Sequence, residues 1–202
     1  AIGTFTTPVL QRYYGLSLVS AASVSGVIIG VMGLLGLVIG GRLCDRAAQR
    51  SASARVRFAA LCLLVAAPLA YLGLAAGQAA LWQLVAFLSL AYLSSIVYLA
   101  ASTPAVADVV RPEQRSAAMG VLFAVGYLLG GAGGPIAVGL LSDALAKSST
   151  GLSADAASAH GLQAAMMILV PIAFLVAAAG MWFAARSVTQ DREAMLAGEG
   201  QR

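Results

Sequence analysis

The sequence predicts an all-α integral membrane protein, and three observations lead to this fold class. Hydrophobic residues make up 60% of the 202 positions and charged residues only 10%, and the mean hydropathy is +0.90. A soluble domain usually carries about 25% charged residues, so this chain has too few to cover a water-facing surface. Five apolar stretches are long enough to cross a bilayer, and most basic residues lie in the connections on one side of them.

The apolar stretches predict helices because each has roughly 20 residues or more, whereas a barrel strand needs about ten and alternates in polarity. Residues 1–11 are expected to be the end of an earlier helix, which leads into the polar turn QRYYGLS. The first residues contain neither an initiator methionine nor a basic signal-peptide start, so we expect this helix to begin upstream. The bundle over 1–186 then has spans at 17–40, 58–77, 81–105, 116–141 and 162–185, and 187–202 is a tail.

The basic residues predict the orientation. Ten of the twelve lie in the first and third connections or after the last span, and only Arg12 and Lys147 lie on the other side. Positive loops stay in the cytoplasm, so we expect the C-terminal tail to be cytoplasmic and the start of the chain to lie outside. Five crossings and one truncated helix make one half of a twelve-helix transporter, whose partner is the other six-helix half. The preference for arginine over lysine is typical of a GC-rich bacterial genome, which predicts a bacterial inner (plasma) membrane.

The charged connection after the first span carries the most specific pattern. The residues Gly41–Arg50 read GRLCDRAAQR. Gly41 is expected to end the helix, and Asp45 to hold a carboxylate at the membrane boundary between Arg46 and Arg50. A carboxylate directed at the N-terminus of another helix gains roughly 0.3–1 kcal/mol, and up to about 2 when partly buried. These four residues are therefore candidate gating residues; the alternative is a solvated loop that only sets the topology.

The third span carries most of the polar side chains within the predicted spans. Ser95, Tyr98 and Ser102 recur at spacings of three and four, and Tyr92 lies close to the same helix face. Such a stripe faces protein or a water-filled pathway rather than lipid; helix–helix hydrogen bonding is the simpler alternative. The candidate cavity and substrate-binding residues are Thr4, Thr7, Tyr92, Ser95, Tyr98, Ser102 and Tyr127.

Glycines mark the first and fourth spans. In the fourth, a glycine-rich stretch leads into Gly134 and Pro135, and the proline removes a backbone donor and predicts a kink. Broken helices of this kind are typical of moving or substrate-facing parts of transporters. The spans 58–77 and 162–185 are almost wholly apolar, and we expect them at the lipid-facing periphery. In the first span, glycines spaced by three or four predict a groove for a close helix neighbour: Gly26, Gly30, Gly33, Gly36 and Gly40.

Together these features resemble the C-terminal half, helices seven to twelve, of a major facilitator superfamily transporter. GRLCDRAAQR resembles the superfamily's loop between helices eight and nine, although Ala48 stands where a glycine is common. The stretches TPVLQRYYGLS, RPEQRSAA and GGAGGPIAVGLLSD are similar to the spinster-like branch. The resemblance implies that Asp45 docks on the facing half and steadies the outward-open state. It also implies that helices seven, eight, ten and eleven line the cavity, while nine and twelve stay outside.

The resemblance implies a secondary active transporter that works by alternating access on a small organic or amphiphilic substrate. Lysolipid-like substrates and proton coupling are associated with this branch. A proton relay needs a buried ionisable group, and no such residue lies deep within a predicted span, so any coupling residue is expected in the other half. A membrane scaffold or receptor that has a transporter-like fold but does not transport is the alternative function.

Other function classes fit the sequence poorly. An intramembrane protease needs a serine nucleophile within reach of a histidine base, and His160, expected in an external loop, has no G-x-S-G partner. We therefore expect no enzyme and no catalytic residues. Cys44 and Cys62 have no zinc or iron–sulfur spacing and are expected to be apolar fillers, so neither metal nor cofactor is predicted. The net charge of +4 is attributed to cytoplasmic arginines rather than to nucleic-acid binding.

Overall fold

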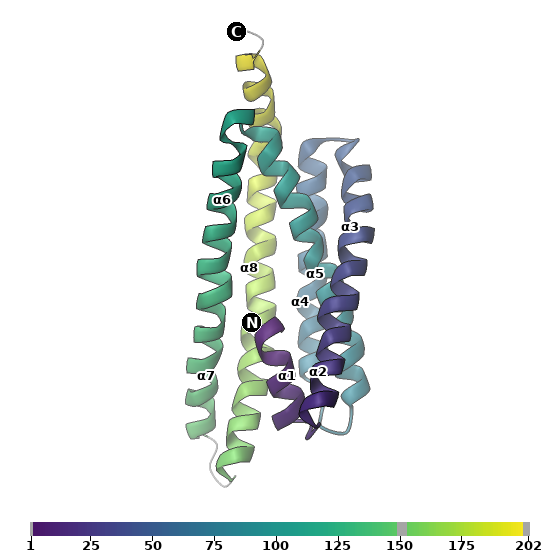
Figure 1. Cartoon of the computed structure of the whole chain (residues 1–202), viewed down its shortest axis with the longest axis vertical. Coiled ribbons are helices and arrows are strands. Elements are labelled where there is room, and N and C mark those ends of the chain that lie inside the picture. Colours follow the sequence, from purple (N-terminus) through teal and green to yellow (C-terminus); the bar gives the residue numbers. More distant parts are fainter. Residues whose placement is uncertain (1, 149–152, 200–202) are drawn as a thin grey trace.

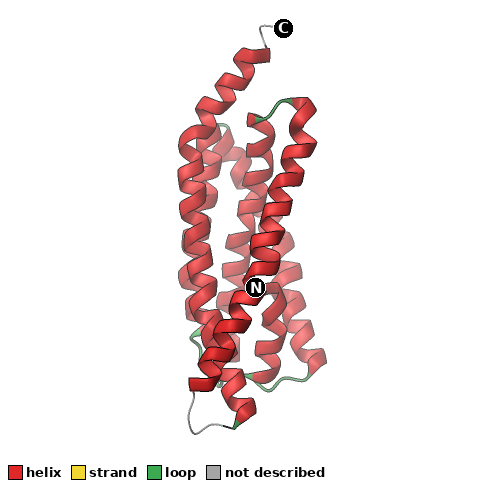
Figure 2. Cartoon of the chain, turned by 90° about the vertical axis from the view of Figure 1, so that its left-hand side faces the viewer, coloured by secondary structure: helices red, strands yellow, loops and turns green. Residues whose placement is uncertain are grey.

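The computed structural model describes residues 2–148 and 153–199, and every regular element in these ranges is a helix (Figures 1 and 2). The long helices run side by side as one bundle, and α8 reaches beyond the others at the C-terminal end (Figure 1). Five helical stretches in the described ranges are long and apolar enough to cross a membrane: Leu18–Ala48, Ala52–Leu74, Leu81–Val109, Pro112–Ser148 and Ala154–Met195. The predicted all-α membrane fold is confirmed.

The short helix α1 (Ile2–Arg12) ends at a turn that precedes the first span. Gly15 lies in this turn with a φ of +70°, a left-handed conformation that glycine adopts without steric cost. The Tyr14 hydroxyl donates a hydrogen bond to the Ala76 carbonyl oxygen at 3.0 Å, which fixes the turn against the end of α4. Burial, reinforced by Tyr13, raises the pKa of Tyr14 from its ordinary value to about 12.

The first span is one continuous helical rod made of α2 (Leu18–Gly26), a π-helical turn (Val27–Val31) and α3 (Met32–Ala48). The predicted glycine groove is present in α3, where Gly33, Gly36 and Gly40 are buried against α5. A Cβ added at Gly36 would lie 2.6 Å from the Leu93 backbone oxygen, so only glycine allows this approach. Gly26 and Gly30 have open space around them in the described chain, so at that end of the groove a close helix neighbour stays a prediction.

The connection after the first span is shorter than expected. α3 continues through Gly41 to Ala48, so the prediction that Gly41 ends the helix is wrong. A glycine inside a helix costs only about 1 kcal/mol relative to alanine, and the leucine, arginines and alanines that follow are good helix formers. Asp45 therefore lies in the last turns of α3. The chain turns at residues 49–51, and the Ser51 side chain accepts a hydrogen bond from the Ala54 N–H, which caps the start of α4.

The core of the bundle lies where α4 (Ala52–Leu74) packs between α5 (Leu81–Val109) and α8 (Ala154–Glu199). In the most apolar 18 residues of α4, 44% are buried, against 22% for α8, so one face of this span packs within the bundle instead of facing lipid. Its many alanines let both neighbours approach closely, and only its opposite face is open. That open face carries large apolar side chains: Leu61, Leu64, Val65, Tyr71 and Leu72.

α8 begins well before its predicted span, at Ala154. His160 is therefore helical rather than in a loop, and its ring lies edge-on to Tyr13 with centroids 5.1 Å apart. Gln163, buried one turn further on, donates to the Leu74 carbonyl oxygen at the end of α4. These contacts join the start of α8 to α1 and α4.

The fourth span consists of a 3₁₀ turn (Pro112–Gln114), α6 (Arg115–Gly126), a π-helical segment (Tyr127–Gly133) and α7 (Gly134–Ser148). Only 6% of its most apolar 18 residues are buried. α7 packs closely on α8, whereas no residue of α6 is buried. The π-helical segment ends directly before Gly134 and Pro135, where the proline has no N–H to donate. The departure from α-helical geometry thus lies on the N-terminal side of the predicted kink residues.

Candidate functional site

A cavity of about 690 Å³ opens among α1, α5, the fourth span and α8. Tyr92, Ser95 and Tyr98 line it from α5, so three members of the predicted polar stripe lie on one wall. Gly130 and Gly134 line it from the fourth span. The rest of the lining is apolar and comes chiefly from α8. A mainly apolar cavity with a few polar groups on one side suits an amphiphilic ligand.

The three polar residues on this wall have different surroundings. Ser95 is buried, and its hydroxyl donates to the Tyr92 carbonyl oxygen at 2.9 Å within the same helix. The Tyr92 ring packs against α3, where a Cβ at Gly33 would lie 3.0 Å from its Cε1 atom. Tyr98 is 44% exposed. Its hydroxyl, like that of the less exposed Tyr92, makes no hydrogen bond to another described residue, so both hydroxyls are free to bind a ligand and that of Tyr98 is the more accessible.

The other four predicted cavity residues do not line this cavity. Thr4 is exposed, whereas the Thr7 hydroxyl donates to the Ser25 hydroxyl of α2 at 2.8 Å, a contact between helices. Ser102 has a buried hydroxyl without a hydrogen-bond partner among the described residues. Tyr127 is 73% exposed, and its ring covers Gly131 of its own helix. A role for these four in ligand binding stays a prediction.

The predicted gating residues lie together at the end of the first span. Asp45, Arg46 and Arg50 are exposed, and Gly41 is half-buried. Asp45 forms no ion pair with any residue in the described ranges. Its carboxylate is therefore available to a group outside this chain, as the gating hypothesis requires.

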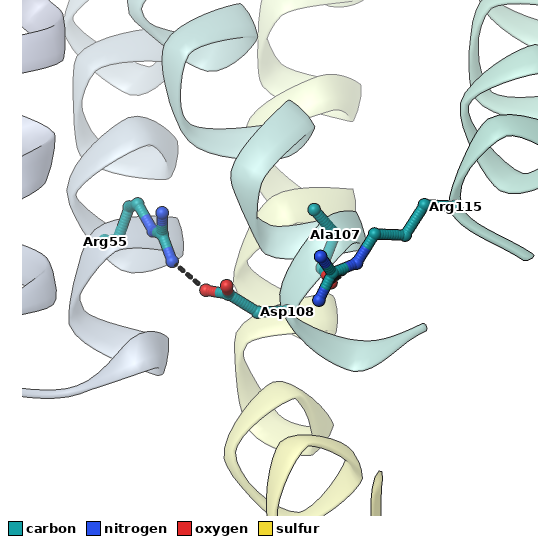
Figure 3. A network of polar contacts seen from close by, with 4 residues as sticks. All are labelled: Arg55, Ala107, Asp108 and Arg115. Atoms are coloured by element: carbon teal, nitrogen blue, oxygen red, sulfur yellow. Dashed lines mark hydrogen bonds and ion pairs between the residues drawn. The ribbon is translucent and has the colours of Figure 1, made fainter. Parts of the chain in front are cut away.

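At the same end of the bundle, the structure reveals an ion pair that the sequence reasoning missed. Arg55 of α4 is buried and donates to the Asp108 carboxylate of α5 (Figure 3). In the next helix, Arg115 Nε donates to the Ala107 carbonyl oxygen at 3.0 Å. The signal was an acidic residue close to the end of a long apolar span, opposite a connection rich in arginine. Because Asp108 lay outside the predicted span 81–105, it received no role.

Polar contacts thus join three helices at this end. Besides the Arg55–Asp108 pair between α4 and α5, Ser53 and Thr189 share a hydrogen bond between α4 and α8. Small apolar residues pack below them, among them Val56 and Ala185. Arg55 Nε has no hydrogen-bond partner within the described chain, so part of its donor capacity is unused.

Comparison with known proteins places this bundle among membrane transporters. No family model matches the chain. It is 33% identical over 191 residues to an MFS-type efflux pump of Mycolicibacterium smegmatis, a match that covers 95% of this chain and 42% of the relative. A solved bacterial homologue of the human lysosomal transporter Spinster, inward-facing and unoccupied, superposes with a TM-score of 0.79 at 22% identity, over 95% of this chain and 45% of that one. Its occupied form gives 0.74 over 94% and 46%.

The bundle therefore has the fold of half a secondary transporter. The chain is similar in sequence to a transporter of the major facilitator superfamily, as its sequence features indicated, and it spans less than half the length of the relatives that it matches.

Proposed function

We propose that this chain is the C-terminal bundle, helices seven to twelve, of a secondary active transporter that works by alternating access. The observation that carries the proposal is the cavity that places Tyr92, Ser95 and Tyr98 opposite an apolar wall. Its shape and chemistry suit a small organic or amphiphilic substrate, with a polar group at the hydroxyls and an apolar part against α8. A lysolipid-like molecule has this character. Because the M. smegmatis relative is an efflux pump, we propose export as the direction.

The poorly packed fourth span supports the need for a second half. α6 and the π-helical segment expose Phe123, Val125 and Leu128. Gly126 and Gly130 beside them have open space in this chain, so the backbone of another helix can approach there. We propose that the N-terminal six-helix half covers this surface and completes the substrate pathway.

The residues that line the cavity also indicate where a proton-coupling residue can lie. Among the described residues that line it, tyrosines are the only ionisable ones, and no Asp, Glu, Lys, Arg or His takes part. If transport is proton-coupled, the proton-binding residue therefore belongs to the other half.

Flux measurements on the full-length protein in proteoliposomes test the function. Tyr98→Phe removes the more exposed of the two free tyrosine hydroxyls and should raise KM for a fluorescent lysolipid about fivefold, because a hydrogen bond contributes about 1 kcal/mol. Tyr71→Phe is the matched control, since Tyr71 is similarly exposed, at 47%, but lies on the outer face of α4. Membrane insertion of both variants is measured in parallel.

Unchanged kinetics in both Tyr98→Phe and Ser95→Ala would remove these residues from the substrate site. Binding of the probe without flux, in well-inserted wild-type protein, would favour the non-transporting scaffold or receptor over the transporter.

A further inference from the structure

An apolar groove separate from the cavity runs between α4 and α8, with a volume of about 330 Å³. Its lining residues are all apolar and none of them lines the cavity described above. Small and large side chains both line it. The small ones are Ala60, Ala178 and Ala179, and the large ones are Leu61, Leu64, Leu175 and Trp182.

On each of the two helices, an arginine lies one helical turn beyond the large lining residues. Arg57 precedes Leu61 by four residues and Leu64 by seven, so it lies on the same face of α4. Arg186 follows Trp182 by four residues on α8. Both arginines are exposed, and neither has a carboxylate partner in the part of the chain that the structure describes.

α4 and α8 run antiparallel, and Arg57 and Arg186 both lie near the same end of this helix pair. The hydrogen bond between Ser53 and Thr189 aligns the two helices just beyond the arginines. The Arg186 guanidinium lies 4.8 Å from the centre of the Phe183 ring, a cation–π contact that holds it along the helix. Two exposed arginines, one on each helix, therefore lie one helical turn beyond the groove at this end.

We propose that this groove binds an anionic phospholipid, with one acyl chain between α4 and α8 and the phosphate at Arg57 and Arg186. The apolar lining matches a hydrocarbon chain, and two unpaired cations at one end match an anionic headgroup. Trp182 lines the groove one helical turn from Arg186, and tryptophan is enriched where apolar and polar regions of a membrane meet. Basic pockets between membrane helices bind anionic headgroups in this way. The site is independent of the substrate cavity and of the direction of transport.

Lipid binding to the full-length protein, measured by native mass spectrometry with added phosphatidylglycerol or phosphatidylcholine, tests the proposal. The double variant Arg57→Gln/Arg186→Gln should bind phosphatidylglycerol about 30-fold more weakly, which corresponds to about 2 kcal/mol at 1.4 kcal/mol per tenfold. Phosphatidylcholine binding should not change. The matched control Arg42→Gln/Arg192→Gln removes two exposed arginines outside the groove and should retain phosphatidylglycerol.

A second pair of variants tests the groove without changing charge. Ala179→Phe should fill it and expel the lipid, whereas Ala184→Phe, exposed on the other side of α8, should have no effect. If Arg57→Gln/Arg186→Gln and Ala179→Phe both bound phosphatidylglycerol as well as the wild type does, the proposal would be overturned. Equal loss in the Arg42→Gln/Arg192→Gln control would overturn it as well, because the binding would then follow net charge alone.

Discussion

Arg55 and Asp108 illustrate how single residues shape the arginine-rich end of this bundle. Arg55 is 7% exposed, and a guanidinium cannot lose its proton to avoid burial. A buried charge is tolerated when it is paired, and Asp108 provides that pairing from the neighbouring helix. The pair also joins α4 to α5 at the level where Ser53 and Thr189 join α4 to α8. This corner should therefore behave as one rigid unit.

Replacing only Asp108 of the ion pair should destabilise the protein more than replacing both Arg55 and Asp108. Asp108→Asn leaves the buried charge of Arg55 unpaired and should destabilise the protein by about 2–3 kcal/mol. This is at or below the lower end of what the loss of one partner of a buried ion pair costs, because Asp108 is one third exposed and water screens the pair. The double variant Arg55→Met/Asp108→Leu should be closer to wild type, because no charge remains buried. Thermal unfolding of the full-length protein in detergent checks this order. A double variant less stable than Asp108→Asn would contradict it, and Arg42→Gln, exposed on α3, is the control.

Among the elements, the contact between α3 and α5 depends most clearly on glycine. A Cβ at Gly36 would lie 2.3 Å from Ile96 Cγ2 and 2.6 Å from the Leu93 backbone oxygen. The side chain of Ile96 can turn away, but the backbone of α5 cannot move without separating the helices. The close packing of these two helices is therefore set at this position.

Gly36→Ala should lower the melting temperature of the full-length protein, because α3 must move away from α5. Gly41→Ala, five residues further along the same helix, has open space around its Cβ and should be neutral or slightly stabilising, since alanine favours helix by up to about 1 kcal/mol. The two variants make the same chemical change in one helix. Equal melting temperatures for both would show that α3 and α5 do not pack as closely as described.

The elements also show what the sequence could predict. Apolar length located every span, because about 20 apolar residues are needed to cross the bilayer. It placed four of the five ends too early, since helices continue beyond the apolar stretch, as α3 does through Asp45, whereas the predicted span 58–77 ends three residues after α4 does. Helical spacing grouped Tyr92, Ser95 and Tyr98, which line one cavity, but it also included Ser102, which does not. Thr7 and Tyr127 could be placed only with knowledge of their neighbours. The burial of α4 was missed because lipid and a protein interior favour the same apolar residues.

On the scale of the whole molecule, the bundle is unevenly packed. α4, α5 and α8 form a tight core, with polar contacts among them at the arginine-rich end, whereas α6 has no buried residue. The cavity lies between these two regions, lined by α5 and α8 on one side and by Gly130 and Gly134 on the other. In an alternating-access mechanism, a rigid core beside a loosely held helix allows one wall of the cavity to move while the other keeps its shape.

Asp45 provides the test of that mechanism. If its free carboxylate docks on the other half in the outward-open state, Asp45→Asn removes a charge–dipole interaction of about 1 kcal/mol and should shift the population about fivefold toward inward-open. Single-cysteine reporters at the exposed positions Ala117 and Ala144, at opposite ends of the fourth span, can be labelled with impermeant maleimide after Cys44 and Cys62 are replaced by alanine. Labelling should rise at Ala117 and fall at Ala144. Asp191→Asn, an exposed carboxylate on α8, is the control, and unchanged labelling in Asp45→Asn would argue against a gating role.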